Sequence, residues 1–269
     1  MDLISLVQLG TVDYATALRL QQQLVALRKE EKIGDVLLLL EHSPVITLGR
    51  NAKAVNIIAS PELLAQRGVE LFECDRGGDV TFHGPGQIVG YPIFDLRGFA
   101  APEGKRKTLG VIEFVRRLEE VLMRTCADFA IAAKRIPGLT GVWTEGAYGD
   151  ASVGAGAPAR PVEPSSTAER ATGEQPEAKL AAIGVHISRF VTSHGFALNV
   201  NTDLSYFNLI IPCGITTKPV TSMQQKLAKK LDLNAVAESI SRNFGVVFQS
   251  QILWADALGA LLSGTVVVP

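Results

Sequence analysis

The sequence predicts an α/β fold in which mixed β-sheets are flanked by helices. Several segments place apolar residues three or four positions apart, which is the spacing of an amphipathic helix. Other apolar runs, such as residues 36–40, are too short and too uniform for such a helix and indicate buried strands. Helical and strand segments alternate irregularly and we find no internal repeat, so we expect mixed sheets rather than a regular βαβ repeat.

In the first half of the chain, we expect a helix that begins near Thr11 or Asp13, since either side chain can cap a helix N-terminus. Residues 36–40, introduced by Asp35, form the first clear buried strand. A short helix is expected over residues 60–68, where a serine precedes a proline and a glycine follows the last turn. The apolar face of the first helix comprises Ala17, Leu20, Leu24 and Leu27.

The second half of the chain contains two longer helical patterns. One helix is expected over residues 108–129 and another over residues 234–245, with a short strand at 141–143. Cys126 lies four residues after Leu122, so we predict that this thiol fills the core. The apolar faces comprise Ile112, Val115, Leu118, Leu122 and Phe129 in the first of these helices, and Val236, Ile240 and Phe244 in the second.

Residues 147–178 differ in composition from the rest of the chain. They are rich in Ala, Gly, Pro, Ser and Glu, and Tyr148 is their only aromatic residue. Such a segment cannot bury enough apolar surface to offset the entropy of ordering it, so we predict a disordered insertion. We therefore expect a single domain over residues 1–248, interrupted by this insertion, and a C-terminal extension over residues 249–269. A short helix packed on the domain surface is expected within the extension.

Composition excludes several classes of protein. The chain has 269 residues, enough to bury a sizeable core, and its net charge of −1 gives no general attraction to nucleic acid. No run approaches the roughly 20 apolar residues of a membrane span. Three widely spaced cysteines and a start without a signal peptide indicate the cytoplasm. The four histidines lack metal-ligand spacing, so we expect no metal, no other cofactor, and a monomer by default.

The densest motif is residues 76–87, Arg-Gly-Gly-Asp-Val-Thr-Phe-His-Gly-Pro-Gly-Gln. Glycine lets backbone amides approach a bound group closely, and proline stiffens a turn. An ordinary surface loop needs only one or two such residues, so this density indicates a backbone shaped around a ligand. The alternative is a hairpin connection that carries a few solvated polar side chains.

Two further segments carry reactive side chains. Residues 209–215 end a strand-like apolar run with Cys213 held between a proline and a glycine. Residues 179–185 begin with Lys179 and continue as an almost wholly apolar strand. An ammonium at the mouth of a core strand is partly desolvated unless an anion lies near it. A lone cysteine at a strand end is more often structural than catalytic. Cys213 therefore indicates a catalytic site only in combination with Lys179.

In their order along the chain, these motifs resemble the lipoyl(octanoyl) transferase family. The resemblance runs from about residue 2 to residue 248 and leaves out the insertion. It implies the fold of the biotin and lipoate protein ligase catalytic domain. The matching segments are residues 41–49, 76–87, 179–184, 195–199, 212–215 and 220–223.

Enzymes of this family move an octanoyl chain from acyl carrier protein to a lysine of lipoyl-domain proteins, such as the acyltransferase subunits of 2-oxoacid dehydrogenases and the glycine cleavage H protein. The resemblance implies that Cys213 is the nucleophile and Lys179 its partner. A nearby cation stabilises the reactive thiolate, and a covalent intermediate predicts ping-pong kinetics. The resemblance also implies an acyl site formed by Arg76, Gly77, Gly78, Asp79, Val80, Thr81, Phe82, His83, Ala182, Ile183, Gly184, Gly195, Phe196 and Ala197.

Within that site, we expect the backbone amides of Gly77, Gly78 and their neighbours to stabilise a developing oxyanion, with His83 close by. His83 is expected to be a site residue and not the base. His186 and His194 are expected to be ordinary polar residues of a strand or loop.

Two other functions remain open. The first is an ATP-dependent lipoate or biotin ligase of the same fold, which needs an adenylate pocket and uses no cysteine acyl-enzyme. The chain has no glycine-rich loop that ends in Gly-Lys-Ser/Thr, which disfavours a Walker-type nucleotide site. The second is a non-catalytic protein that binds acyl carrier or lipoyl domains, for which Cys213 would be dispensable.

Overall fold

The computed structural model describes residues 2–100, 108–145, 176–255 and 259. The helices are α1 Tyr14–Lys29, α2 Pro61–Gln66, α3 Val111–Asp128, α4 Met223–Leu227 and α5 Leu233–Phe248. The strands are β1 Asp2–Val12, β2 Asp35–His42, β3 Val45–Leu48, β4 Glu70–Glu73, β5 Val80–His83, β6 Gln87–Ile93, β7 Ala133–Ile136, β8 Leu139–Thr144, β9 Lys179–Ser188, β10 Val191–Asn199 and β11 Ser250–Trp254.

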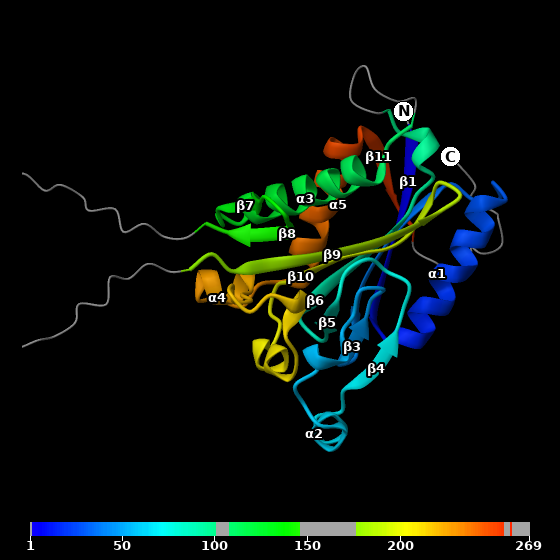
Figure 1. The fold of residues 1–269 in the computed structure, drawn as a ribbon. Helices are drawn as coiled ribbons and strands as arrows, with labels where there is room; N and C mark the ends of the chain where they lie inside the picture. Colours follow the sequence, from blue (N-terminus) through cyan, green and yellow to red (C-terminus); the bar gives the residue numbers. More distant parts are fainter. Residues whose placement is uncertain (1, 101–107, 146–175, 256–258, 260–269) are drawn as a thin grey trace, which may run out of the picture.

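The strands form two mixed sheets, as the irregular alternation of elements predicts (Figure 1). The larger sheet has eight strands in the order β11-β1-β2-β6-β10-β9-β8-β7. Its β11, β1 and β2 are parallel, whereas the pairs from β2 to β7 are antiparallel. The smaller sheet has the order β4-β3-β5, with one parallel and one antiparallel pair.

Helices cover both faces of the larger sheet, which explains the uniform apolar run of β2. Leu37 and Leu39 belong to the core cluster that contains residues of α3 and α5. Leu38 and Leu40 belong to the cluster on the other face, where α1 packs. Because successive strand residues point to opposite faces, a strand buried on both sides needs apolar residues at every position.

The smaller sheet has its own core, which places the motif 76–87. Ile46, Val80 and Phe82 pack with Phe207 and Leu209, from the 3₁₀ segment Leu204–Leu209. The ring of Phe82 stacks on Tyr206 at 4.7 Å between centroids. This packing fixes one face of β5, so the opposite face is left for the site.

The predicted starts of α1 and α2 are confirmed by their caps, whereas the helix expected from residue 108 begins at Val111 as α3. The Asp13 Oδ1 atom accepts a hydrogen bond from Thr16 N at 2.9 Å and caps α1. The Ser60 Oγ atom caps α2, in which Pro61 occupies the first position. Short polar side chains at these positions satisfy amides that have no partner within the helix.

The apolar face predicted for α3 is partly wrong. Ile112 is 71% exposed, whereas Phe114, Leu118 and Leu122 are fully buried. At 3.6 residues per turn, Ile112 lies roughly 160° around the helix from Phe114, so one stripe cannot hold both. Cys126 is fully buried, which confirms that this thiol fills the core.

The C-terminal extension begins with a strand that we did not expect, whereas residue 259, the one described residue beyond 255, is helical. Residues Ser250–Trp254 form β11, which pairs in parallel with β1. Gln249 has a φ of 54° and turns the chain out of α5 toward the free edge of β1. Pairing satisfies the backbone groups of that edge, which a surface helix would leave open. The remainder of the extension lies outside the described residues, apart from residues 255 and 259.

Most of the predicted insertion at 147–178 also lies outside the described residues. Its final residues are ordered: the carbonyl of Ala178 accepts a hydrogen bond from Thr144 N at 2.8 Å. The Glu177 carboxylate forms ion pairs with Lys134 and Lys218. Among the residues that the structure describes, none of the helices combines the length and the hydrophobicity that a membrane span requires.

Candidate active site

The structure brings Lys179 and Cys213 together. Lys179 is the first residue of β9, and its Nζ atom donates a hydrogen bond to Cys213 Sγ at 3.2 Å. The lysine is buried, with 6% of its surface exposed, whereas the cysteine is partly exposed. A thiol therefore reaches solvent while the amine beside it is shielded.

Cys213 lies in the 3₁₀ turn Pro212–Gly214 and not at the end of a strand, which corrects the strand-like assignment of residues 209–215. Pairing ends after the isolated bridge between Ile57 and Ile210, because Pro212 has no amide hydrogen to continue it. The φ of Cys213 is +56°, an uncommon value for a residue with a side chain. Such a conformation persists only when its surroundings impose it.

Asp79 anchors this turn. Its Oδ2 atom accepts a hydrogen bond from Asn56 Nδ2 at 2.6 Å, and Asn56 O accepts one from Ile211 N at 2.7 Å. A Cβ on Gly214 would lie 2.9 Å from Asp79 Oδ2, so this close approach requires glycine. The loop of the motif 76–87 therefore holds the cysteine turn in place.

Lys179 is positioned by aromatic and backbone contacts. Its Nζ atom lies 4.9 Å from the ring centroid of Trp143, and no salt bridge to it occurs in the described part of the chain. Gly141 has a φ of +126°, and a Cβ there would lie 2.5 Å from the carbonyl oxygen of Ala181 and 3.2 Å from Lys179 Cε. The Lys179 ammonium therefore lies close to both the sulfur atom of Cys213 and the ring face of Trp143.

Arg76 shapes the glycine-rich loop from inside. Its Nη2 atom donates to Thr47 O at 2.7 Å and to Thr47 Oγ1 at 2.8 Å, and Nη1 donates to Gly77 O at 3.0 Å. The amide of Gly77 donates to Val185 O at 3.0 Å, so it is not available to an oxyanion as we expected. No described residue accepts a hydrogen bond from the amides of Gly78 and Asp79.

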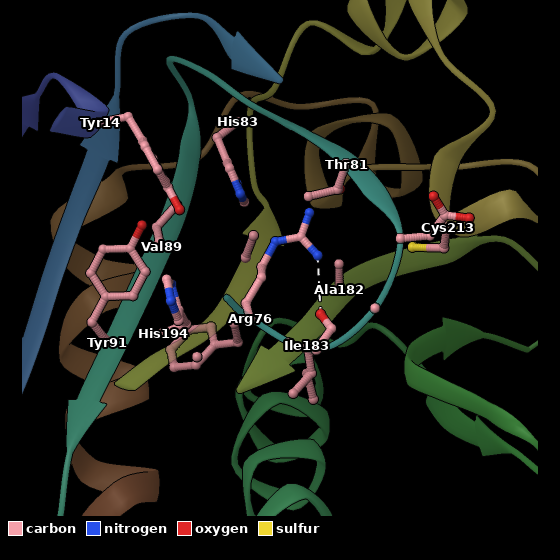
Figure 2. A pocket seen from close by; sticks show the side chains of 17 residues that line it. Tyr14, Arg76, Thr81, His83, Val89, Tyr91, Ala182, Ile183, His194 and Cys213 are labelled. Carbon is pink, nitrogen blue, oxygen red and sulfur yellow. Dashed lines mark hydrogen bonds between the residues drawn. The ribbon is translucent and has the colours of Figure 1, made fainter. Parts of the chain in front are cut away.

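A hollow of about 470 Å³, its open mouth included, extends inward from Cys213; we call it the central hollow. Figure 2 shows Cys213 at one end, Arg76 in the middle, and Tyr14, Tyr91 and His194 at the other end. Small residues of β9 and β10 leave this space open. It is lined by Tyr14, Arg76, Gly77, Gly78, Asp79, Thr81, His83, Val89, Tyr91, Ala182, Ile183, Gly184, His194, Gly195, Phe196, Ala197 and Cys213.

Two residues expected at the acyl site lie elsewhere. Val80 and Phe82 are buried in the core of the smaller sheet, whereas Thr81 and His83 line the central hollow. All four belong to β5, and side chains alternate between the faces of a strand. The resemblance marked the whole segment, but only every second side chain of β5 can reach the hollow.

His83 is neutral and fixed by its neighbours. Burial, with the nearby His42, lowers the pKa of His83 to about 3. Its Nδ1 atom donates to Gln87 Oε1 at 2.8 Å, because the Gln87 amide nitrogen donates to Asn199 Oδ1. Burial likewise lowers the pKa of His42 to about 4, and Tyr91 Oη donates to its Nε2 atom at 2.7 Å.

The inner end of the central hollow was missed from the sequence. Tyr14, Val89, Tyr91 and His194 line it, and burial raises the pKa of both tyrosines, so these remain protonated. The Tyr14 hydroxyl is buried without a hydrogen-bond partner among the described residues. Side chains alternate between the two faces of a strand, so Val89 and Tyr91 of β6 point to the same side. This pattern could have indicated that both residues line the hollow. No local pattern marked Tyr14, which belongs to α1.

His194 is part of a buried network and not an ordinary polar residue as expected. Its Nε2 atom hydrogen-bonds Asp75 Oδ1 at 2.7 Å. His186 Nε2 lies 3.5 Å from the other oxygen of the same carboxylate. Burial lowers the pKa of His194, although Asp75 opposes the shift. Within the described residues, no three His, Cys, Asp or Glu side chains converge on a metal site.

Comparisons with known proteins agree with this geometry. The profile of the family described as "Lipoyl protein ligase A/B catalytic domain" matches residues 13–245. The chain is 58% identical over 260 residues to an octanoyltransferase of Koribacter versatilis, covering 97% of this chain and 90% of that protein. It is 50% identical over 261 residues to an octanoyltransferase of Acidobacterium capsulatum, covering 96% of each.

Solved structures of lipoate protein ligases share the fold. A bipartite lipoate protein ligase from Thermoplasma acidophilum matches with a TM-score of 0.66 and 13% identity, covering 98% of this chain and 91% of that one. A lipoate-protein ligase A bound with ATP matches with a TM-score of 0.64 and 11% identity, covering 98% and 93%. At such identities, the likeness shows the fold alone.

Proposed function

The chain belongs to the lipoyl protein ligase A/B catalytic domain family, and from this membership we propose that it transfers an octanoyl group through a thioester on Cys213. The donor is octanoyl acyl carrier protein and the acceptor a lysine of a lipoyl-domain protein. The observation that carries the proposal is the 3.2 Å contact between Lys179 Nζ and Cys213 Sγ at the mouth of the central hollow.

In the first half-reaction, the thiolate of Cys213 attacks the thioester carbonyl of the donor. The new carbon–sulfur bond forms, the bond to the donor sulfur breaks, and the ammonium of Lys179 gives its proton to the departing thiolate. One thioester replaces another, so no nucleotide is needed. The amine of Lys179 is left neutral beside the acyl-enzyme.

In the second half-reaction, the neutral amine of the acceptor lysine attacks the same carbonyl. An amide forms, the bond to Cys213 Sγ breaks, and Lys179 Nζ takes the proton that the acceptor nitrogen loses. The thiolate and the ammonium are thereby restored. A thioester is exchanged for an amide, which makes this step downhill.

The amides of Gly78 and Asp79 are our candidates for the oxyanion hole. Both lie in the loop that lines the central hollow, and neither has a partner among the described residues. Backbone donors already fixed in place stabilise a developing charge without reorganising. This assignment replaces Gly77, whose amide is bonded to Val185 O.

The central hollow is the proposed place for the acyl tail. Ala182, Gly184, Gly195 and Ala197 leave the space that larger side chains would fill. Burying seven CH₂ and CH₃ groups at about 0.8 kcal/mol each would contribute roughly 5 to 6 kcal/mol. That contribution favours a medium chain over acetyl. We retain the cytoplasm and a monomer as parts of this proposal.

Intact-mass measurement tests the proposal directly. The protein is mixed with octanoyl acyl carrier protein and no acceptor, in the absence of ATP. We expect a gain of one octanoyl group, absent from Cys213→Ala and present in Cys126→Ala. Addition of a lipoyl-domain acceptor should remove the group from the enzyme and place it on the acceptor.

The same experiment separates the alternatives. A ligase of the same fold would form no acyl-enzyme and would lipoylate the acceptor only when ATP is added. Its activity would survive the substitution Cys213→Ala. A non-catalytic binding protein would never gain mass, and Cys213→Ser would leave its affinity for the carrier unchanged.

A further inference from the structure

A second hollow lies behind the inner end of the central hollow. It has a volume of about 920 Å³ with its open mouth included, and it lies between α1 and the strands β9 and β10. Leu18 and Val25 of α1 contribute apolar surface to it, and His186 and Ser188 of β9 contribute polar groups. His194 is the one residue that lines both hollows in the described part of the chain.

His194 is held firmly between the two spaces. Its ring is bonded to Asp75 at 2.7 Å, and its backbone amide donates to Gln21 Oε1 at 2.8 Å. Its ring lies at 85° to the ring of Tyr91, with 6.5 Å between the two centroids. With 3% of its surface exposed, His194 forms a fixed wall rather than a mobile side chain.

The other residues at the inner end are backed by packed core. Tyr14 lies against the rings of His42 and Phe72, each at 5.3 Å between centroids. Tyr91 is bonded to His42, which is fully buried. Truncating His194 would open the central hollow into the second one, because this side chain lines both.

We propose that His194 is the residue that ends the acyl site, and that it limits the length of the acyl chain. This inference rests on the proposed octanoyl transfer. A longer chain would have to displace the imidazole ring, which would break its bond to Asp75. The extra methylenes would meet a polar wall and gain little from burial.

The test uses His194→Gly. The φ of His194 is +55°, a conformation that glycine adopts freely, so this variant keeps the backbone. Acyl-enzyme formation is measured by intact mass with octanoyl, dodecanoyl and hexadecanoyl carrier proteins. We expect the dodecanoyl-to-octanoyl rate ratio to rise about tenfold, since the polar second hollow buries the added methylenes incompletely.

His186→Ala is the matched control. His186 contacts the same carboxylate of Asp75 and lines the second hollow, but it does not line the central hollow. This variant should keep the chain-length profile of the native protein. A shift as large as that of His194→Gly would assign the effect to loosening of Asp75 and overturn the inference.

Failure of the inference is distinct from failure of the proposed function. If the native protein forms no octanoyl-enzyme, the transfer chemistry is wrong. If the native protein forms it and His194→Gly keeps the native chain-length ratios, His194 does not set the limit. Should His194→Gly fail to fold, His194→Asn, which also tolerates positive φ, should raise the decanoyl-to-octanoyl ratio; an unchanged ratio overturns the inference.

Discussion

The two ends of the central hollow are built differently. At the mouth, Cys213 is partly exposed, sits in a left-handed turn and is bonded to an ammonium. At the inner end, Tyr91 and His194 are buried, and each is fixed by a side-chain hydrogen bond. The transfer chemistry that we propose therefore takes place at the mouth, where Lys179 lies beside Cys213. The inner end forms the wall of the space that we propose for the acyl tail.

This difference assigns different consequences to substitutions at the two ends. Changes at the mouth should affect the rate of transfer, whereas changes at the inner end should affect selectivity or stability. The predictions below test that division, beginning with the largest effect.

Cys213→Ala should lower the transfer rate by on the order of 10⁴ or more, because no covalent intermediate can form. Octanoyl transfer to a lipoyl-domain acceptor is the measurement, and the melting temperature should stay close to that of the native protein. Substantial residual transfer would show that the mouth acts only by binding.

Lys179→Ala should lower the transfer rate by about 10²–10⁴, the range typical of a positioned acid or base. The reaction of the remaining thiol with iodoacetamide should slow as well, since the adjacent ammonium is lost. Native turnover by this variant would remove Lys179 from the mechanism.

Gly141→Ala should slow transfer by about tenfold or more without touching a reacting atom, since a small displacement of a catalytic group is costly. The new Cβ would lie 3.2 Å from Lys179 Cε and 2.5 Å from Ala181 O. Gly138→Ala is the matched control, since Gly138 also has positive φ but a Cβ added there would meet no atom within 4 Å in the described chain. Equal losses in both variants would indicate backbone strain alone.

Acid should destabilise the protein through two buried histidines, His42 and His83, whose ring centroids lie 5.8 Å apart. The folded-state pKa is about 4 for His42 and about 3 for His83, against an ordinary value of 6.5. The unfolded chain therefore binds more protons between pH 6.5 and 4, and stability falls as the pH falls through that range. The loss is on the order of 1 kcal/mol per pH unit for each histidine. Urea unfolding at pH 7, 6 and 5 measures it, and His42→Gln should reduce the slope.

Cys126→Ala should have the smallest effect on transfer, which we expect to stay near the native rate. Burial raises the pKa of this thiol to about 12, so it remains unreactive. A loss of about 1 to 2 kcal/mol in unfolding free energy is expected from the vacated volume. Mapping of iodoacetamide adducts should find Cys213 modified and Cys126 intact in the folded protein.

Short-range patterns predicted most of the helices and strands. Asp13 and Ser60 cap α1 and α2 as expected, and the apolar run at 36–40 lies in β2. The sequence-based predictions missed features that depend on packing against segments distant in the sequence. Residues 250–254 form a strand because they pair with the otherwise free edge of β1. Phe82 lies outside the site because its ring packs against Phe207.

The site was predicted in part for the same reason. Lys179 and Cys213 are recognisable from their motifs, and their side chains meet across 34 residues of sequence. His194 and Asp75 are 119 residues apart, and neither carries a local signal for the contact they make. Tyr14 reaches the hollow only because α1 packs against the larger sheet.

By itself, the sequence determined the fold class, two capped helices, the buried strands and the two residues, Lys179 and Cys213, that we propose as the reactive pair. These depend on periodicity, capping and motif order, which are properties of neighbouring residues. The tertiary structure alone decided which face of β5 meets the hollow, which amides are free, and where the hollow ends. Those outcomes depend on packing and on hydrogen bonds between distant segments, whose geometry is fixed only when the two sheets and their helices assemble.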